Sequence, residues 1–208
     1  MTNKGAKERG RFSLGMTNKS VQAKGGIVFK QRKVREPVGE AGLFEYAVRS
    51  LASRMRTERD LRRLMKVRAV PGDEGERAMD GVVARLKELK YLSDTRFAAD
   101  YTRLRKENEK FGRRRVQQDL ASKGVASETV GAAVGAAYDG VDEVALARAY
   151  VARKRMKQPS GEKAKQESAR VMGRLLRAGF SAGTVFKVLR DWGVEVEEVD
   201  VDVEESSA

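Results

Sequence analysis

Apolar residues recur along this chain at the spacing of helix faces, in runs separated by glycine, proline or charged residues. In the first run, Phe44, Ala47, Val48, Leu51 and Met55 lie at positions i, i+3, i+4, i+7 and i+11, the period of an amphipathic α-helix. Similar runs continue to Trp192, and over these runs valine does not cluster in the alternating stretches typical of strands. The pattern therefore predicts an all-α fold.

The later runs each predict one inward-facing stripe and one helix start. Side chains that can accept hydrogen bonds from the first turn stand before several runs, at Thr57, Ser93, Asp142 and Ser181. The chain's three prolines fall in the predicted connections. The predicted inward positions are Leu61, Leu64, Met65 and Arg68; Met79, Val82, Val83, Leu86 and Leu89; Phe97, Tyr101, Leu104 and Asn108; Val116 and Leu120; Val144, Leu146, Ala147, Tyr150 and Val151; Ser168, Val171, Met172, Leu175 and Leu176; and Val185, Val188, Leu189 and Trp192.

A period of 55 residues links three of the predicted helices. Two apolar positions repeat at this spacing, and four residues later a helix stop repeats, with glycine in the second and third copies. The alternative, chance agreement between amphipathic helices, is disfavoured by the shared glycine position. We therefore predict an elongated tandem array of three three-helix repeats, at 43–92, 93–141 and 142–192. The aligned sets are Leu61, Val116 and Val171; Met65, Leu120 and Leu175; and Ala69, Gly124 and Gly179.

The two ends of the chain differ from the array in composition. Residues 1–40 contain ten Lys or Arg, three acids and no lasting helical stripe, so we predict a disordered basic arm. Residues 193–208 contain seven acids and no base, which predicts an acidic tail. The arm either attracts DNA or only keeps the chain soluble. The tail either competes with DNA for the basic surface or only keeps the chain soluble.

Charge favours a polyanionic partner. The 208 residues carry 43 Lys or Arg against 30 Asp or Glu, a formal net charge of +13. Such an excess favours nucleic acid through neutralisation of phosphates, although a solvated charged surface is the alternative. Cysteine and histidine are absent, which excludes disulfides, thiolate or histidine metal sites and His-dependent nucleophilic catalysis. No apolar run approaches the roughly 20 residues of a membrane span, and the composition fits the cytoplasm.

The candidate contact residues are cations on the two helices around Gly112. One set lies along the helix after Ser93, opposite its apolar stripe, and the other lies beside it on the next helix. For each residue the alternative is an ordinary solvated face. No catalytic, cofactor-binding or metal-binding residue is predicted. The candidates for binding a partner or DNA are Arg96, Arg103, Lys106 and Lys110, with Arg113, Arg114, Arg115 and Lys123.

Two stretches of the sequence resemble a known family. The stretch 47–64 resembles the opening of the RecX (OraA) family of recombinase regulators, and Tyr91 to Tyr101, followed by Gly112-Arg113-Arg114 and Lys123-Gly124-Val125, resembles its central signature. The resemblance covers 43–192 and is weak in the third repeat. It implies tandem three-helix repeats and a monomeric, cytoplasmic inhibitor in DNA repair and SOS control. Such a protein binds the groove of the RecA filament on DNA and restrains ATP hydrolysis and strand exchange, without catalytic residues of its own.

Two other function classes compete with this interpretation. Direct, non-specific binding of single-stranded or double-stranded DNA, as by a nucleoid protein, fits the charge and the helix-turn-helix-like pairs. An enzyme is disfavoured, because the carboxylate pairs Asp94 with Asp100 and Asp139 with Asp142 contain residues better explained by helix capping. No Gly-rich phosphate loop is present either.

Overall fold

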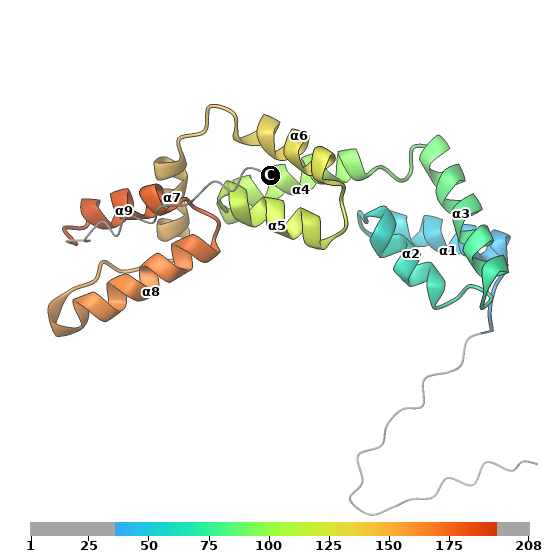
Figure 1. Cartoon of the computed structure of the whole chain (residues 1–208), viewed down its shortest axis with the longest axis horizontal. Helices are drawn as coiled ribbons and strands as arrows, with labels where there is room; N and C mark the ends of the chain where they lie inside the picture. Colours follow the sequence, from blue (N-terminus) through green and yellow to red (C-terminus); the bar gives the residue numbers. More distant parts are fainter. Residues whose placement is uncertain (1–35, 195–208) are drawn as a thin grey trace, which may run out of the picture. The chain divides into compact units, whose positions relative to one another are not determined.

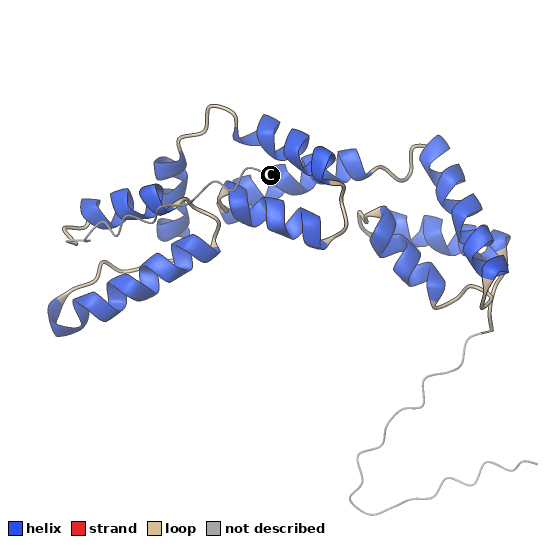
Figure 2. Ribbon diagram, viewed as in Figure 1, coloured by secondary structure: helices blue, strands red, loops and turns tan. Residues whose placement is uncertain are grey.

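A computed structural model describes residues 36–194 of the chain. Within that range it contains nine α-helices, one short 3-10 helix (Gly161–Lys163) and no strand (Figures 1 and 2). The all-α prediction is confirmed there, while most of the predicted basic arm and acidic tail lies outside. The α-helices are α1 (Glu40–Ser53), α2 (Glu58–Lys66), α3 (Asp73–Glu88), α4 (Asp94–Glu109), α5 (Arg113–Ser122), α6 (Ser127–Tyr138), α7 (Glu143–Arg153), α8 (Ala164–Arg177) and α9 (Ala182–Asp191).

Buried apolar residues form three clusters, each within three consecutive helices. In every group the first helix packs on the third, as α1 on α3, α4 on α6 and α7 on α9. The half-buried ring of Phe111 packs against both the second and the third cluster. The exact residues that divide the chain into units stay a prediction. Fully buried members of the clusters are Leu43, Leu61, Met65 and Leu86; Val116, Leu120 and Val134; and Leu175, Val185 and Leu189.

The predicted helix caps are confirmed. The side chains of Thr57, Ser93 and Ser181 each accept a hydrogen bond from the backbone N–H three residues on. Asp142 accepts from the N–H groups of Val144 and Ala145. These bonds satisfy donors that the first turn of a helix otherwise leaves free.

Five predicted inward positions were wrong, and one of them is Asn108, which is exposed. The other four, Met55, Leu89, Leu104 and Leu176, are each between 43% and 49% exposed. Met55 follows the end of α1 at Ser53, and Leu89 is the C-cap of α3, so neither continues the stripe of its helix. Leu104 lines an open groove described below. The inner face of α1 is also turned by one position, because Leu43, Ala47 and Ser50 are the buried residues.

The six apolar positions of the 55-residue repeat are all buried. Gly124 and Gly179 follow α5 and α8 with φ of +78° and +93°, a left-handed conformation that favours glycine. Ala69 takes the place of a glycine after α2. There Val38 donates its N–H to the carbonyl of Arg68 at 2.8 Å, so the preceding chain covers the end of α2.

Candidate binding surface on the central helices

Some candidate cations of α4 form ion pairs or hydrogen bonds within the fold, and others do not. Arg103 forms ion pairs with Asp100 at 3.4 Å and Glu107 at 3.6 Å. Lys106 donates to the carbonyl of Ala137 on α6 at 2.6 Å, so the structure directs it toward the neighbouring helix. By contrast, Lys110 ends α4 in a left-handed conformation and forms no ion pair with a described residue.

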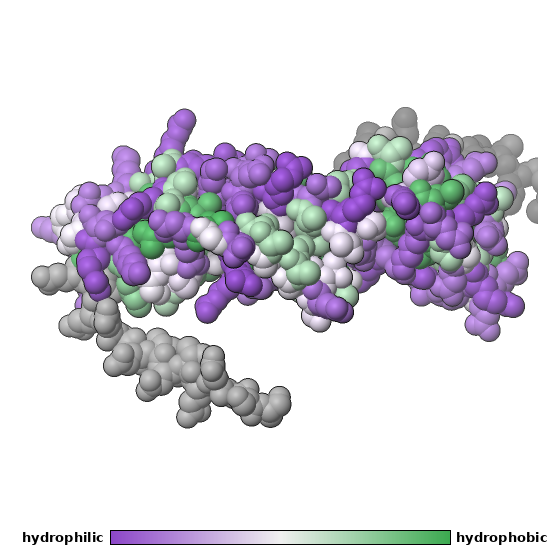
Figure 3. Space-filling model, turned by 90° about the horizontal axis from the view of Figure 1, so that it is seen from above, coloured by the Kyte–Doolittle hydropathy of each residue, from purple (hydrophilic) through white to green (hydrophobic). Residues whose placement is uncertain are grey.

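The cations of α5 lie at its first turn. Arg113, Arg114 and Arg115 are all exposed. Arg115 is held by Asp119 one turn later at 3.1 Å. Arg113 forms no ion pair with a described residue. Arg113 therefore presents charge to solvent without an ion pair, while Arg114 is exposed and attracted by Glu143. The face drawn in Figure 3 mixes hydrophilic residues with apolar patches.

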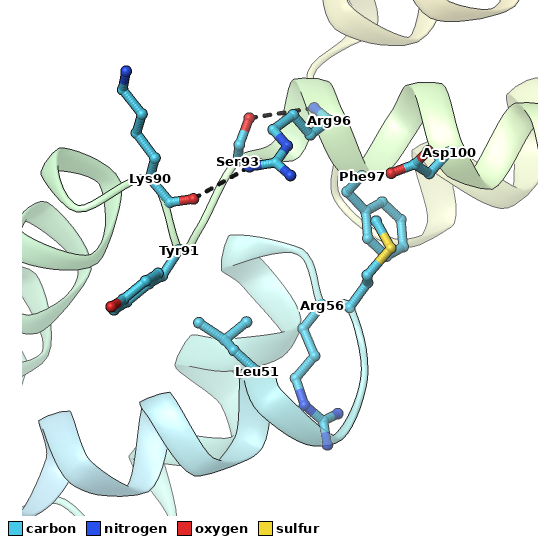
Figure 4. Close-up of a pocket in the computed structure, with 9 residues that line it drawn as sticks. Leu51, Arg56, Lys90, Tyr91, Ser93, Arg96, Phe97 and Asp100 are labelled. Carbon is cyan, nitrogen blue, oxygen red and sulfur yellow. Dashed lines mark hydrogen bonds between the residues drawn. The ribbon is translucent and has the colours of Figure 1, made fainter.

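An open groove runs between the end of α1 and the first half of α4. Two adjoining hollows of about 300 Å³ and about 350 Å³ share Met55, Arg56 and Phe97 in their walls. Figure 4 shows the first, where Arg96 turns its guanidinium toward the carbonyl of Lys90. Further wall residues are Leu51, Lys90, Tyr91, Ser93, Arg96 and Asp100 in one hollow, and Arg54, Asp60, Tyr101, Leu104 and Lys123 in the other.

The groove combines an apolar base with a mainly cationic edge. Tyr91 is 60% exposed, although it is a large ring that folding normally covers. The acids of the edge are already engaged, because Asp60 pairs with Arg63 and Asp100 with Arg103. Lys123 lies 5.5 Å from the centre of the Tyr101 ring, a cation–π distance. The groove can therefore bind a ligand that carries a flat or apolar group beside a negatively charged group.

The start of α2 is joined to the end of α5; we call this joint A. The hydroxyl of Thr57 donates to the carbonyl of Lys123 at 2.9 Å, and Arg59 donates to the carbonyl of Ser122 at 3.0 Å. The N–H of Glu58 donates to the carboxylate of Asp94 at 2.9 Å. Side chains at the start of α2 thus donate to free carbonyls at the end of α5, and the Asp94 carboxylate accepts from a free N–H of α2.

The start of α5 is joined to the end of α8 in the same sense; we call this joint B. The N–H of Gly112 donates to the carbonyl of Ala178 at 2.8 Å, and that of Arg114 donates to the carbonyl of Gly179 at 3.2 Å. Nearby, Glu109 pairs with Arg153 and Lys154, each at 3.4 Å. The candidate cations of α5 are therefore fixed by a backbone contact.

Ionisation in joint A is shifted by burial and by close neighbours. Burial raises the pKa of Asp94 above its ordinary value of 3.8, and the negative charge of Glu58 acts in the same direction. Burial also raises the pKa of Glu58, but hydrogen bonds from Lys87 and Arg62 outweigh it, and its pKa is lowered overall. The carboxylates of Asp94 and Glu58 therefore lie close together, and their pKa values are shifted in opposite directions. This arrangement fits a structural contact.

Several of these features were not predicted from the sequence. Asp94 was expected to cap its own helix, but Ser93 does so and Asp94 accepts from α2 instead. The exposed Tyr91 and the joining role of Phe111 carried no signal beyond their apolar character. Within the described residues no group of three or more acids is placed to hold a metal ion. In residues 36–194 no helix has the length and apolar character needed to cross a membrane.

Comparison with known proteins gives one family throughout. A model of the second three-helix domain of RecX matches residues 93–134. The regulatory protein RecX of Streptomyces coelicolor (strain ATCC BAA-471 / A3(2) / M145) is 30% identical over 156 residues, which are 75% of this chain and 79% of that protein. The regulatory protein RecX of Thermobifida fusca (strain YX) is 31% identical over 158 residues, covering 74% and 80%.

Two solved structures share the fold. A crystal structure of regulatory protein RecX superposes with a TM-score of 0.61 at 21% identity, covering 73% of each chain. The crystal structure of RecX from Lactobacillus salivarius gives a TM-score of 0.52 at 20% identity, covering 74% of this chain and 96% of that one. At these identities the likeness establishes the all-helical fold alone.

Proposed function

This chain belongs to the RecX family, and from that membership we propose that it regulates the RecA recombinase. In this proposal it binds the groove of the RecA filament on DNA and restrains ATP hydrolysis and strand exchange, acting as a cytoplasmic monomer without catalysis of its own. The observation that carries the proposal is the match, at 30% identity, to a regulatory protein RecX over three quarters of the chain.

The basic helices support a role in binding a protein–DNA filament. A filament repeats its protein surface and its phosphates, so several weak contacts can act together and raise the overall affinity. The described helices offer such contacts at separate places, on α4, on α5 and along the groove beside Met55. No enclosed pocket is required for this kind of binding.

The structure orders the candidate contacts by how free their charges are. We propose Lys110, Arg113 and Arg114 as the leading contacts, together with Arg96 in the groove. Arg103 and Arg115 follow, because nearby acids already neutralise part of their charge. Lys106 and Lys123 rank last, since Lys106 donates to the carbonyl of Ala137 and Lys123 lies over the ring of Tyr101.

The test is the ATPase activity of RecA on single-stranded DNA, titrated with this protein. We expect inhibition by the natural chain and weaker inhibition by the Arg113→Ala/Arg114→Ala/Arg115→Ala variant at unchanged helicity. A control with the same change in charge, Arg49→Ala/Lys66→Ala/Arg77→Ala on α1–α3, is expected to inhibit normally. No inhibition by the natural chain would reject the function, whereas equal inhibition by both variants would reject only the contact assignment.

Direct, non-specific DNA binding is the second candidate. It is favoured by the net charge of +13 and by the exposed Tyr91 beside cations, since bases stack on exposed rings next to basic residues. The two candidates differ in one measurement. A nucleoid-type protein would bind naked DNA tightly, with an affinity that falls steeply with salt, and would leave the ATPase of preformed filaments unchanged.

A further inference from the structure

The group α7–α9 contains an open apolar cavity that the proposed function does not use. Its volume is about 690 Å³, and its wall includes Pro159, Met172, Leu189 and Trp192. Two uncharged polar side chains beside it already have hydrogen-bond partners. The Ser168 hydroxyl donates to the carbonyl of Ala164 at 2.7 Å, and Gln158 donates to the carbonyl of Trp192 at 2.5 Å. The cavity therefore suits aliphatic side chains rather than a polar ligand.

The wall of this cavity and the segment that leads to it carry cations with no ion-pair partner among the described residues. Lys165 lies in its wall, and Arg155, Lys157 and Lys163 lie on the connection between α7 and α8 or on the 3-10 helix that ends it. All four are exposed, and none forms an ion pair with a described residue. Glu162 is the only acid among residues 153–165. An occupant should thus carry negative charge next to its apolar groups.

The chain itself contains a segment of this composition, and it begins at the cavity. Gly193 and Val194 line the wall, and the next eleven residues, 195–205, hold seven acids, no base and four valines. The valines are Val196, Val199, Val201 and Val203, and the last three alternate with Asp200 and Asp202. In an extended segment, alternation places valines on one side and carboxylates on the other.

We propose that residues 195–205 cover the cavity of their own chain, with valines in the apolar hollow and carboxylates against the cations of 155–165. The reach is short, because Val196 follows a wall residue by two positions, or about 7 Å of extended chain. Covalent attachment also gives the segment a high effective concentration, so weak contacts suffice. The acidic segment and any polyanion then compete for the same cations.

Trp192 provides a direct test, because it lies in the wall and is the chain's only tryptophan. Its fluorescence is compared in the full chain and in a chain ending after Val194. We expect truncation to shift the emission to longer wavelength and to raise quenching by neutral acrylamide about twofold, since the ring loses its apolar cover. High salt should produce part of the same change in the full chain and none in the truncated one.

Two variants of the full chain keep the test independent of truncation. Val199→Ser/Val201→Ser/Val203→Ser removes the apolar contacts, and Lys157→Gln/Lys163→Gln/Lys165→Gln removes the charge contacts; each is expected to raise quenching. Arg49→Gln/Lys66→Gln/Arg77→Gln makes the same change in charge on α1–α3 and should leave quenching unchanged. Circular dichroism checks that each variant keeps its helices.

Two results would overturn the proposal. Quenching that is the same with and without residues 195–208, and unchanged by the valine variant, means that the segment does not cover the cavity. Quenching that depends on protein concentration and not on the segment means that a second copy covers it instead. Neither result bears on inhibition of RecA, so this proposal and the proposed function can fail separately.

Competition is measured with a labelled deoxythymidine oligonucleotide. Truncation removes seven acids and should tighten binding for any basic protein. The proposal requires more: the gain on truncation should largely disappear when Lys157, Lys163 and Lys165 are replaced by glutamine. The matched α1–α3 control should keep the gain, and an equal gain in both backgrounds would contradict competition at this cavity.

Discussion

Joint A and joint B place equivalent residues in contact but use different atoms. Thr57 and Lys123 of joint A lie 55 residues before Gly112 and Ala178 of joint B, which is the period of the repeat. In joint A the donor is the side-chain hydroxyl of Thr57, whereas in joint B it is the backbone N–H of Gly112. The helices of joint B can therefore approach backbone to backbone.

Glycine explains how joint B reaches this closer contact. A Cβ atom added at Gly112 would lie 2.3 Å from the carbonyl oxygen of Gly179, and one added at Gly179 would lie 2.2 Å from the nitrogen of Arg115. In joint A a Cβ added at Gly124 would instead meet the side chain of Arg59, at 2.2 Å from its Cδ. A side chain can move aside and a backbone cannot, so the two joints should differ in their tolerance of substitution.

The largest effect is expected from Gly179→Ala in joint B. The substitution introduces a clash with backbone atoms of Arg115 and forces alanine to adopt a φ of +93°. We expect a loss of about 2–4 kcal/mol in the free energy of unfolding, measured by urea denaturation followed by circular dichroism. Gly183→Ala on α9 is the control: its Cβ meets open space, so stability should stay constant or rise by about 0.5 kcal/mol.

A smaller and reversible effect is expected from Gly124→Ala in joint A. The φ of +78° and the contact with Arg59 should cost about 1–2 kcal/mol. In a double-mutant cycle, Arg59→Ala should recover part of this loss by removing the obstructing atoms. The corresponding pair in joint B, Gly179→Ala with Arg115→Ala, should recover nothing. Equal recovery in both joints would show that their backbones are equally free to move.

The next effect comes from the hydroxyl of Thr57. Thr57→Val keeps the shape but removes the donation to Lys123 and the cap on Asp60, at 2.9 Å and 3.2 Å. Because Thr57 is fully buried, we expect a loss of about 1–2 kcal/mol. Two variants serve as controls. Ser93→Ala removes a cap whose hydrogen bond stays within its own helix, and Thr57→Ser keeps the hydroxyl group. A loss no greater than that of Ser93→Ala would mean that joint A gains nothing from this bond.

The sequence predicted what depends on near neighbours along the chain. Helix type, the caps at Thr57 and Ser181, and the buried repeat positions depend on spacing within one helix, and all are confirmed. The glycine stop at Gly124 and Gly179 also follows from local backbone geometry. Local rules failed at helix ends, where Met55 and Leu89 follow a stripe that no longer faces the core.

The joints and the groove could not be predicted in the same way. The contact of Thr57 with Lys123 joins residues 66 apart, and Asp94 contacts a helix 36 residues earlier. Which cations stay free also depends on such contacts: Lys106 matched the spacing of an exposed face, yet the carbonyl of Ala137 lies 2.6 Å from it. Periodicity identifies a helix face but not what a neighbouring helix places against it.

The smallest effect tests the charge in joint A through Asp94→Asn. Burial raises the pKa of Asp94 in the folded state, so its stabilising contribution is complete below about pH 4 and is lost as pH rises through the folded pKa. Asparagine carries no charge, and its carbonyl can still accept from Glu58. We expect a gain of about 0.5 kcal/mol or less near pH 7, and no difference near pH 3, where the aspartic acid is itself neutral. Denaturation of both chains at the two pH values measures this gap, and a clear loss of stability near pH 7 would show that joint A depends on the negative charge of Asp94.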